Sequence, residues 1–287
     1  MRAQITLTTS ESKKLIAKAV VSLDSFKRAL HSGLIAIHPS STTGFIYEEL
    51  TGRRPKGVWV CGVILPKGTC VSWERQRERL RGAVNPGDKH HSVDHFRYSW
   101  FFRRGEYLEG VPLGEILAEM KAGDIYVKAP NAIDFQGRVG VLYVSKKAGT
   151  LGKAILASRK KKFDIFLPAS LEKMVFTPIP EAARAASRTR TDAAMGIPVG
   201  LMPVTGQVIT EIDAVRILTG AKAFHIASGG LGGAEGAVTL SVNGTAGQVR
   251  EVVRIIESVK GAKARRVRST DCRSCTIESC HRRLGIW

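Results

Sequence analysis

Short apolar runs that alternate with helical segments constrain the fold of the first 180 residues more than any other sequence feature. Residues 34–37 are wholly apolar, and residues 139–144 and 164–167 are nearly so. Helical stretches lie between such runs, for example residues 10–20, which begin with a serine suited to cap a helix. Short, continuously apolar strands are typical of sheets covered on both faces. We therefore predict an α/β domain over residues 1–180, with a largely parallel sheet and flanking helices.

The second half of the chain has a different pattern. Residues 181–192 read as a short basic helix or a linker. The elements expected after it are a strand, a helix, two strands and a helix, at 199–202, 211–218, 223–227, 237–242 and 246–259. This βαββα order is typical of a small ferredoxin-like α+β domain, which we place at 193–260. Residues 261–287 then form a basic tail that contains cysteines.

Within the first domain, residues 75–104 are polar and rich in Arg, His, Gly and Pro. We predict a long excursion from the core there. It contains His90, His91, Asp94 and His95. On a helix, His91 and His95 would share a face and could hold a metal with Asp94 beside them, whereas exposed loop histidines are the commoner case.

The composition excludes several classes of protein. Hydrophobic residues make up 44% of the 287 residues and charged residues 24%, which excludes intrinsic disorder. No apolar run is long enough for a membrane span, and the first residues show no secretory signal. We therefore expect a soluble, cytoplasmic protein that does not bind membranes.

Basic residues exceed acidic ones by a wide margin, with 44 Lys and Arg against 25 Asp and Glu and a formal net charge of +19. Three windows hold this excess: residues 51–104, 146–190 and 260–287. Such blocks are typical of surfaces that bind anions, either small ones or the phosphates of a nucleic acid. Solvated faces of a very basic protein would give the same composition.

Two turns between a strand and a helix have the character of anion sites. The first is rich in hydroxyl groups, with Ser40, Ser41, Thr42, Thr43 and Gly44. The second combines glycines and lysines, with Lys146, Lys147, Gly149, Gly152 and Lys153. Free N–H groups and the dipole at a helix N-terminus favour phosphate or carboxylate, whereas simple capping or a tight turn would need fewer such residues.

A third candidate loop, at residues 228–236, is rich in glycine and contains Glu235. Its glycines are Gly229, Gly230, Gly232, Gly233 and Gly236. Ordering so many glycines is entropically costly, which favours a ligand-binding loop over a plain connection between two strands.

The tail contains the strongest chemical signal, because Cys272, Cys275 and Cys280 lie within nine residues and His281 follows directly. Thiolates at this spacing suit Zn²⁺ or an iron–sulfur cluster. The fourth ligand would be His281, Cys61, Cys70 or a group from outside the chain. Incidental thiols in a flexible tail are the alternative.

Two segments carry a resemblance to a known superfamily. Residues 40–50 combine the Ser-Thr turn with a helix that ends in Glu48, Glu49 and Leu50, and residues 124–134 combine a strand with a segment that ends in Asp134. In this order and separation they resemble the phosphate-binding turn and the later acidic segment of the ribose-5-phosphate isomerase/glucosamine-phosphate isomerase/CoA-transferase superfamily.

The resemblance covers residues from about 35 to 155 and departs from the superfamily at specific positions. Pro39 stands near the usual leading glycine, and Lys128, Asn131 and Ala132 stand at usually acidic positions, so that only Asp134 remains acidic. The resemblance therefore implies a fold and an anion pocket, and not isomerase activity.

Together these patterns predict a protein that binds a phosphorylated or carboxylated small molecule between the three loops. If the protein catalyses a reaction, we expect an enzyme that contains a metal ion or an iron–sulfur cluster. Asp134 and Glu235 are then the candidate acid and base, and Lys153 would stabilise negative charge. The alternative is a nucleic-acid or ribosome-associated basic binding protein. A third interpretation is a subunit whose ferredoxin-like domain assembles into a homo-oligomer.

Overall fold

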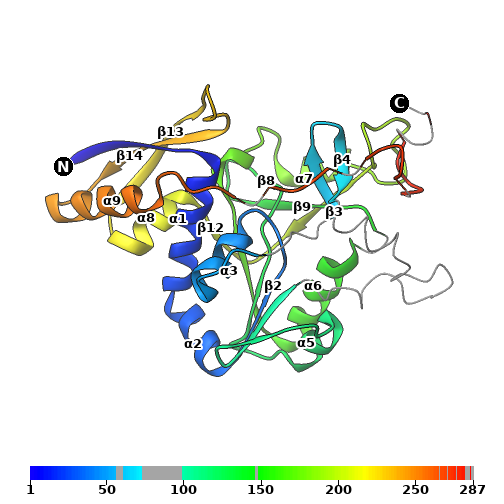
Figure 1. Cartoon of the computed structure of the whole chain (residues 1–287), viewed down its shortest axis with the longest axis horizontal. Helices are drawn as coiled ribbons and strands as arrows, with labels where there is room; N and C mark the ends of the chain where they lie inside the picture. Colours follow the sequence, from blue (N-terminus) through cyan, green and yellow to red (C-terminus); the bar gives the residue numbers. More distant parts are fainter. Residues whose placement is uncertain are drawn as a thin grey trace.

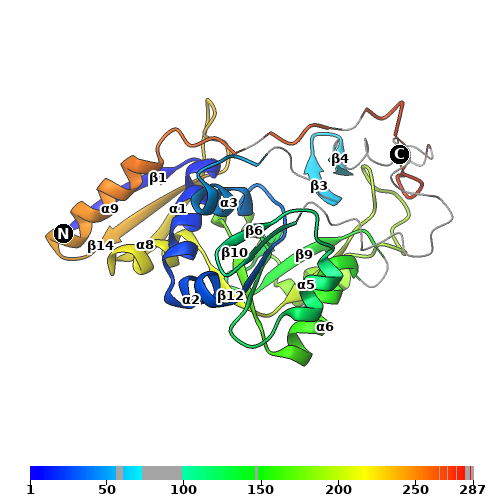
Figure 2. The ribbon, with the colours of Figure 1, turned by 60° about the horizontal axis from the view of Figure 1, so that its bottom comes forward.

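The computed structural model describes residues 1–55, 61–72, 99–145, 148–264, 266–269, 271–275, 277–281 and 285. Its central feature is a six-stranded sheet (Figures 1 and 2). In spatial order the strands are β12 (Gln207–Ile209), β10 (Asp164–Pro168), β7 (Ile125–Val127), β2 (Leu34–Ile37), β5 (Trp100–Arg103) and β6 (Glu106–Leu108). The first four are parallel, and β5 and β6 are antiparallel. The predicted α/β character is confirmed, although the sheet is mixed.

The antiparallel pairing of β5 with β6 has a local cause. Arg104 and Gly105 connect β5 to β6, and both have positive φ angles, 48° and 83°. Such two-residue turns match the twist of antiparallel strands. Strand β5 returns to the sheet beside β2, so the end of the predicted excursion at 75–104 belongs to the sheet. Residues 73–98, with the four candidate ligands at 90–95, lie outside the described residues.

The sheet is apolar because helices cover both of its faces, as alternate residues of β2 show. Ile35 and Ile37 belong to the core beneath α1 (Thr9–Ser22), α2 (Asp24–Ser32) and α3 (Thr43–Thr51). Leu34 and Ala36 face the core beneath α5 (Leu113–Glu119) and α6 (Gly149–Lys161). A strand buried on both sides reads as a continuous apolar run.

A second sheet joins the two ends of the chain. Its strands are β1 (Arg2–Leu7), β14 (Ala237–Asn243) and β13 (Lys222–Gly229), all antiparallel. Helices α8 (Glu211–Thr219) and α9 (Ala246–Val259) pack with α1 in the core shared with the main sheet. The predicted capping box of α9 is confirmed, because the Thr245 N–H donates to Gln248 Oε1 at 2.9 Å.

The five elements predicted after residue 193 are all present, but they do not build one sheet. The first of them, β11 (Gly200–Val204), pairs with β9 (Val139–Tyr143), which also pairs with β8 (Ala132–Ile133). The next strand, β12, extends the main sheet instead. Strands from both predicted domains therefore share sheets.

The remaining described elements are the hairpin β3 (Cys61–Leu65) and β4 (Gly68–Val71), the short turn of helix η2 (Leu171–Lys173) and α7 (Ile179–Ala185). Among the described residues, every helix is too short or too polar to cross a bilayer.

Candidate functional site

The hydroxyl-rich turn lies between β2 and α3, as predicted, but it bonds mainly to itself. Thr43 Oγ1 donates to the His38 carbonyl at 2.6 Å, and the Thr43 N–H donates to Ser40 Oγ at 3.0 Å. The N–H groups of Gly44 and Phe45 also donate to carbonyls within the turn. Most donors that would hold an anion at this helix N-terminus are therefore already occupied.

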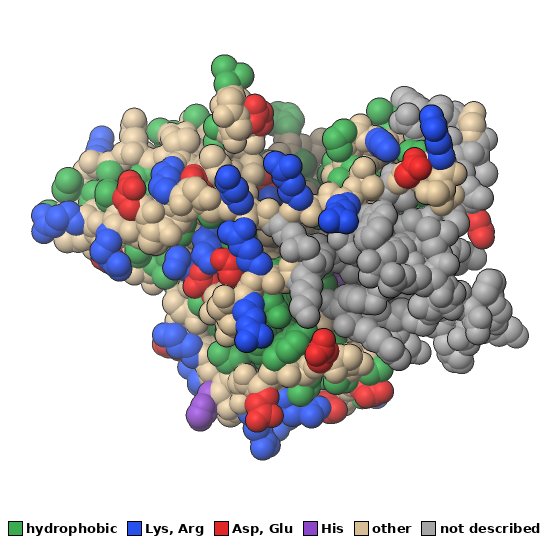
Figure 3. Space-filling view, viewed as in Figure 1, with side chains coloured by type: hydrophobic (Ala, Val, Ile, Leu, Met, Phe, Trp, Pro, Cys, Tyr) green, Lys and Arg blue, Asp and Glu red, His purple; other side chains and the backbone are tan. Residues whose placement is uncertain are grey.

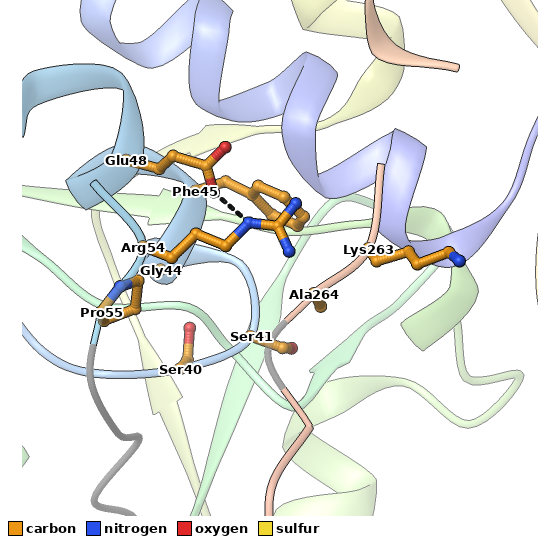
Figure 4. Close-up of a pocket in the computed structure, with 9 residues that line it drawn as sticks. All are labelled: Ser40, Ser41, Gly44, Phe45, Glu48, Arg54, Pro55, Lys263 and Ala264. Carbon is orange, nitrogen blue, oxygen red and sulfur yellow. Dashed lines mark ion pairs between the residues drawn. The ribbon is translucent and has the colours of Figure 1, made fainter. Parts of the chain in front are cut away.

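A small cavity of about 20 Å³ adjoins this turn. Its lining residues are Ser40, Ser41, Gly44, Phe45, Glu48, Arg54, Pro55, Lys263 and Ala264. Figure 4 shows Arg54 extending across the site toward Glu48, while Lys263 points away. The distance from Arg54 Nε to Glu48 Oε2 is 3.7 Å. This volume holds about one water molecule, and an anion would have to compete with Glu48 for Arg54.

The second predicted turn precedes α6. Ala148 and Gly149 both have positive φ angles, 55° and 54°, and Gly152 lies in the first turn of the helix. Lys153 is exposed on α6, and Lys146 and Lys147 lie outside the described residues. Ser145, at the start of this turn, lines a much larger cavity.

We call this second hollow the arginine cavity. It is open, has a volume of about 630 Å³, and is lined by Tyr143, Ser145, Ala183, Arg184, Ala186, Ser187, Arg188, Thr189 and Arg190. Three of these residues are cationic, four carry hydroxyl groups, and none is acidic. The cavity therefore concentrates positive charge around hydrogen-bond donors.

The local backbone sets the walls of the arginine cavity. Arg188 Nε donates to the Val144 carbonyl, which ties the segment after α7 to the end of β9. The Arg190 N–H donates to Ser187 Oγ at 3.0 Å. Opposite Tyr143 stands Gly200 of β11, and a Cβ there would overlap the Tyr143 ring. Glycine at this position leaves space for the ring on the cavity wall.

The sequence did not single out these arginines, which fall in the segment read as a short helix or linker. Residues 182–191 hold three arginines and no acid, alternating with small and hydroxyl side chains. The absence of acidic residues from this stretch is the sequence feature that could have indicated an anion site here. The position of the segment against β9 depends on tertiary structure.

The glycine-rich loop lies apart from both cavities. It forms the tip of the β13–β14 hairpin, where Leu231 is 90% exposed. Figures 1 and 2 both show this tip well away from α6. Glu235 is exposed, and its pKa is lowered by hydrogen bonds from its own backbone N–H and that of Gly233. The structure does not bring the three loops together around one ligand.

Asp134 has the environment of a structural carboxylate. It is buried and accepts hydrogen bonds from the N–H groups of Gln136, Arg138 and Ile179 and from Arg138 Nε, at 2.7–3.0 Å. Burial raises its pKa, but the hydrogen bonds together lower it by more, so that the pKa of Asp134 lies below its ordinary value. Its oxygens join the β8–β9 hairpin to the start of α7, which leaves no free oxygen for acid–base chemistry.

A buried polar cluster occupies the carboxyl edge of the parallel strands, where α/β proteins place ligands. Glu211 accepts from Ser170 Oγ at 2.7 Å and from the Leu171 N–H, and burial raises its pKa. Burial and nearby Lys13 lower the pKa of Lys173 to about 8, and its Nζ donates to the Pro130 carbonyl at 3.0 Å. Lys173 is half-buried. The sequence does not single it out, since its environment depends on packing.

The cysteines of the tail approach the β3–β4 hairpin. Cys272 is exposed, whereas Cys70, Cys275 and Cys280 are half-buried. Burial raises the pKa of the Cys70 thiol. Next to it, Ser72 pairs with Ser269 of the tail, and Val71 belongs to the core on which Cys275 and Cys280 pack. Cys61 lies in β3, but its side chain is outside the described residues.

His281 also lies in this region, and its backbone N–H donates to the Gly196 carbonyl. Its buried Nδ1 makes no hydrogen bond to any described residue. Within the described ranges, no three His, Cys, Asp or Glu side chains converge in a geometry that would hold a metal ion.

On the face in Figure 3, Lys and Arg side chains occur in small groups with acidic side chains between them.

Comparison with known proteins found no matching family model, no matching curated protein and no matching solved structure. The resemblance of residues 35–155 to the isomerase and CoA-transferase superfamily therefore stays a prediction.

Proposed function

We propose that the chain binds a phosphorylated or carboxylated small molecule in the arginine cavity. The observation that carries this proposal is the charge of the lining, with Arg184, Arg188 and Arg190 and no acidic residue. Guanidinium groups form paired, charge-assisted hydrogen bonds with the oxygens of phosphates and carboxylates. Within the described part of the chain, none of the three has a carboxylate partner, so no acidic side chain there neutralises their charge.

Size and polarity support a small ligand over a polymer. The volume of about 630 Å³ lies within the range of small-molecule sites. Ser145, Ser187 and Thr189 supply hydroxyl donors, and the Tyr143 ring supplies an aromatic wall. A ligand with an anionic group and a less polar body would use both.

The proposal concerns binding and includes no reaction. Asp134, Glu235 and Lys153 do not belong to the lining of the cavity. The association with nucleic acid or ribosomes and the assembly into a homo-oligomer stay predictions, and the nucleic acid enters the test below as a competing outcome.

Isothermal titration calorimetry and thermal shift with ribose 5-phosphate, pyrophosphate, citrate and sulfate test the proposal. We expect binding of at least one phosphate ester or carboxylate, with much weaker binding of sulfate. The triple variant R184Q/R188Q/R190Q should lose at least about 100-fold in affinity, since each charged hydrogen bond contributes about 1.5–3 kcal/mol.

A charge-matched control carries R28Q, K222Q and R250Q, three exposed cations outside the cavity. This control should retain the affinity of the wild-type protein. The proposal is wrong if no small anion binds, or if the two triple variants lose affinity equally. RNA binding that falls steeply with salt, in the absence of small-anion binding, would instead favour the nucleic-acid alternative.

A further inference from the structure

Three segments far apart in the sequence meet at the β3–β4 hairpin: the strand β4, the chain just before β11, and the C-terminal tail. The Thr69 N–H donates to the Met195 carbonyl at 2.9 Å, and the Ile197 N–H donates to the Thr69 carbonyl at 2.8 Å. The His281 N–H donates to the Gly196 carbonyl at 2.9 Å. Figures 1 and 2 both show the tail beside β4. Backbone hydrogen bonds therefore hold the tail in the neighbourhood of the hairpin.

Two glycines make this approach sterically feasible. Gly68 and Gly196 have φ angles of 107° and 101°. A Cβ at Gly68 would overlap the Met195 carbonyl, and one at Gly196 would overlap the Thr69 carbonyl. Only glycine combines these angles with this closeness. The position of β4 and its cysteine is thus defined by the backbone and does not rest on a surface contact alone.

A small apolar core fixes the tail cysteines on the same site. Cys275 and Cys280 pack against a cluster formed by Val71 of β4, Ile197 and Ile277. The Cys275 N–H donates to the Cys272 carbonyl at 3.4 Å, which keeps the third tail cysteine in the same turn. Two tail cysteines therefore pack on a core that includes a residue of β4, the strand that carries Cys70, and Cys272 lies in the same turn as Cys275.

We propose that Cys70, Cys272, Cys275 and Cys280 together bind a metal centre through four thiolates, with Cys70 as the ligand that the hairpin supplies. Soft thiolates select Zn²⁺ or an iron–sulfur cluster, and either is held by four cysteines in many proteins. Binding requires each thiol to lose its proton to solvent. Arg273, which follows Cys272 in the sequence, favours the resulting negative charge.

The thiols do not yet converge as ligands of a single ion, so binding has to draw them together. Cys272 is the exposed member and lies in a turn outside any helix or strand. It is therefore the side chain with the most freedom to close the site, while Cys70 stays fixed on β4. The buried Nδ1 of His281 is the alternative fourth ligand, and the test must distinguish a site that uses it from one that uses Cys70.

The metal centre would lie beside the arginine cavity, which links it to the rest of the protein. Val144 packs against the core of the tail cysteines, and its neighbours Tyr143 and Ser145 line the cavity. The metal proposal does not rest on the proposed function, because the thiols and the arginines are different residues.

The first test measures metal in the full-length protein purified anaerobically with a thiol reductant. We expect about one Zn²⁺ per chain, or about four iron and four sulfide ions with absorbance near ~400 nm. C70S should reduce the bound metal at least about fivefold, as should C275S, whereas C61S and H281N should retain it. The arginine triple variant should also retain its metal, so that failure of one proposal leaves the other intact.

A second measurement uses the wild-type protein and does not depend on the folding of C70S. Thiol alkylation is followed by mass spectrometry before and after removal of the metal with a chelator. Cys70, Cys272, Cys275 and Cys280 should become reactive together when the metal leaves, while the rate at Cys61 stays constant. Substoichiometric metal in the wild-type protein, or alkylation of Cys70 at the same rate with and without metal, would overturn the proposal.

Discussion

Two regions of this molecule have the composition of an anion site, and they differ in how their polar groups are satisfied. In the turn from β2 to α3, hydroxyl and N–H groups donate to carbonyl and hydroxyl oxygens of the turn, and Arg54 has Glu48 as its partner. In the arginine cavity, the described residues provide no acid for three arginines. Polar groups that satisfy one another stabilise a fold, whereas unpaired charges are available to a ligand. Asp134 is of the first kind, because both of its oxygens accept hydrogen bonds, whereas Arg188 is of the second kind, because it lines a cavity without an acidic residue.

The largest effect is expected where the polar groups are most fully satisfied. D134A should lower the free energy of unfolding by about 3–5 kcal/mol, because it leaves buried N–H donors without an acceptor. Urea denaturation measures this loss. D164A, at an exposed aspartate, should cost less than about 0.5 kcal/mol. If D134A is as stable as D164A, Asp134 is not a structural carboxylate and the comparison fails.

The buried cluster at the carboxyl edge of the parallel strands should show itself in the pH dependence of stability. The pKa of Lys173 is about 8 in the folded protein, against an ordinary value of 10.5. Between these values the unfolded chain binds more protons than the folded chain. The free energy of unfolding should therefore rise as the pH increases from 8 to 10.5, by up to about 3 kcal/mol.

Denaturation at several pH values measures the contribution of Lys173 by comparing two variants. K173M should flatten the rise above pH 8, while K222M, at an exposed lysine, should leave it unchanged. Equal slopes in the wild-type protein and K173M would mean that Lys173 titrates at its ordinary value, and the cluster would then be solvated.

The smallest of these effects compares the two anion-like regions directly. R188Q should weaken the binding of the best ligand of the cavity by about 10-fold, or ~1.4 kcal/mol, because one charged hydrogen bond is lost. S41A, in the turn before α3, should change this affinity less than about twofold. The reverse result would assign the ligand to that turn, as the superfamily resemblance implies.

Sequence patterns predicted most elements of this fold because helices and strands depend on local periodicity. The apolar run at β2, the capping residues of α9 and the helix after the hydroxyl-rich turn all lie where expected. The mixed sheet was not predicted, since β5 reaches β2 from a distant part of the chain. The pairing of β1 with β14 likewise joins opposite ends of the chain. Periodicity shows that a strand exists, but it does not show which strand lies next to it.

The candidate site divides in the same way. The sequence alone determined that basic residues cluster in three windows and that Cys272, Cys275 and Cys280 lie close enough to act together. Only the tertiary structure decided that Arg188 faces a cavity, that both oxygens of Asp134 accept hydrogen bonds, and that the tail lies beside β4, the strand of Cys70. The physical reason is that the availability of a polar group depends on its partners, and most of these partners are distant in the sequence.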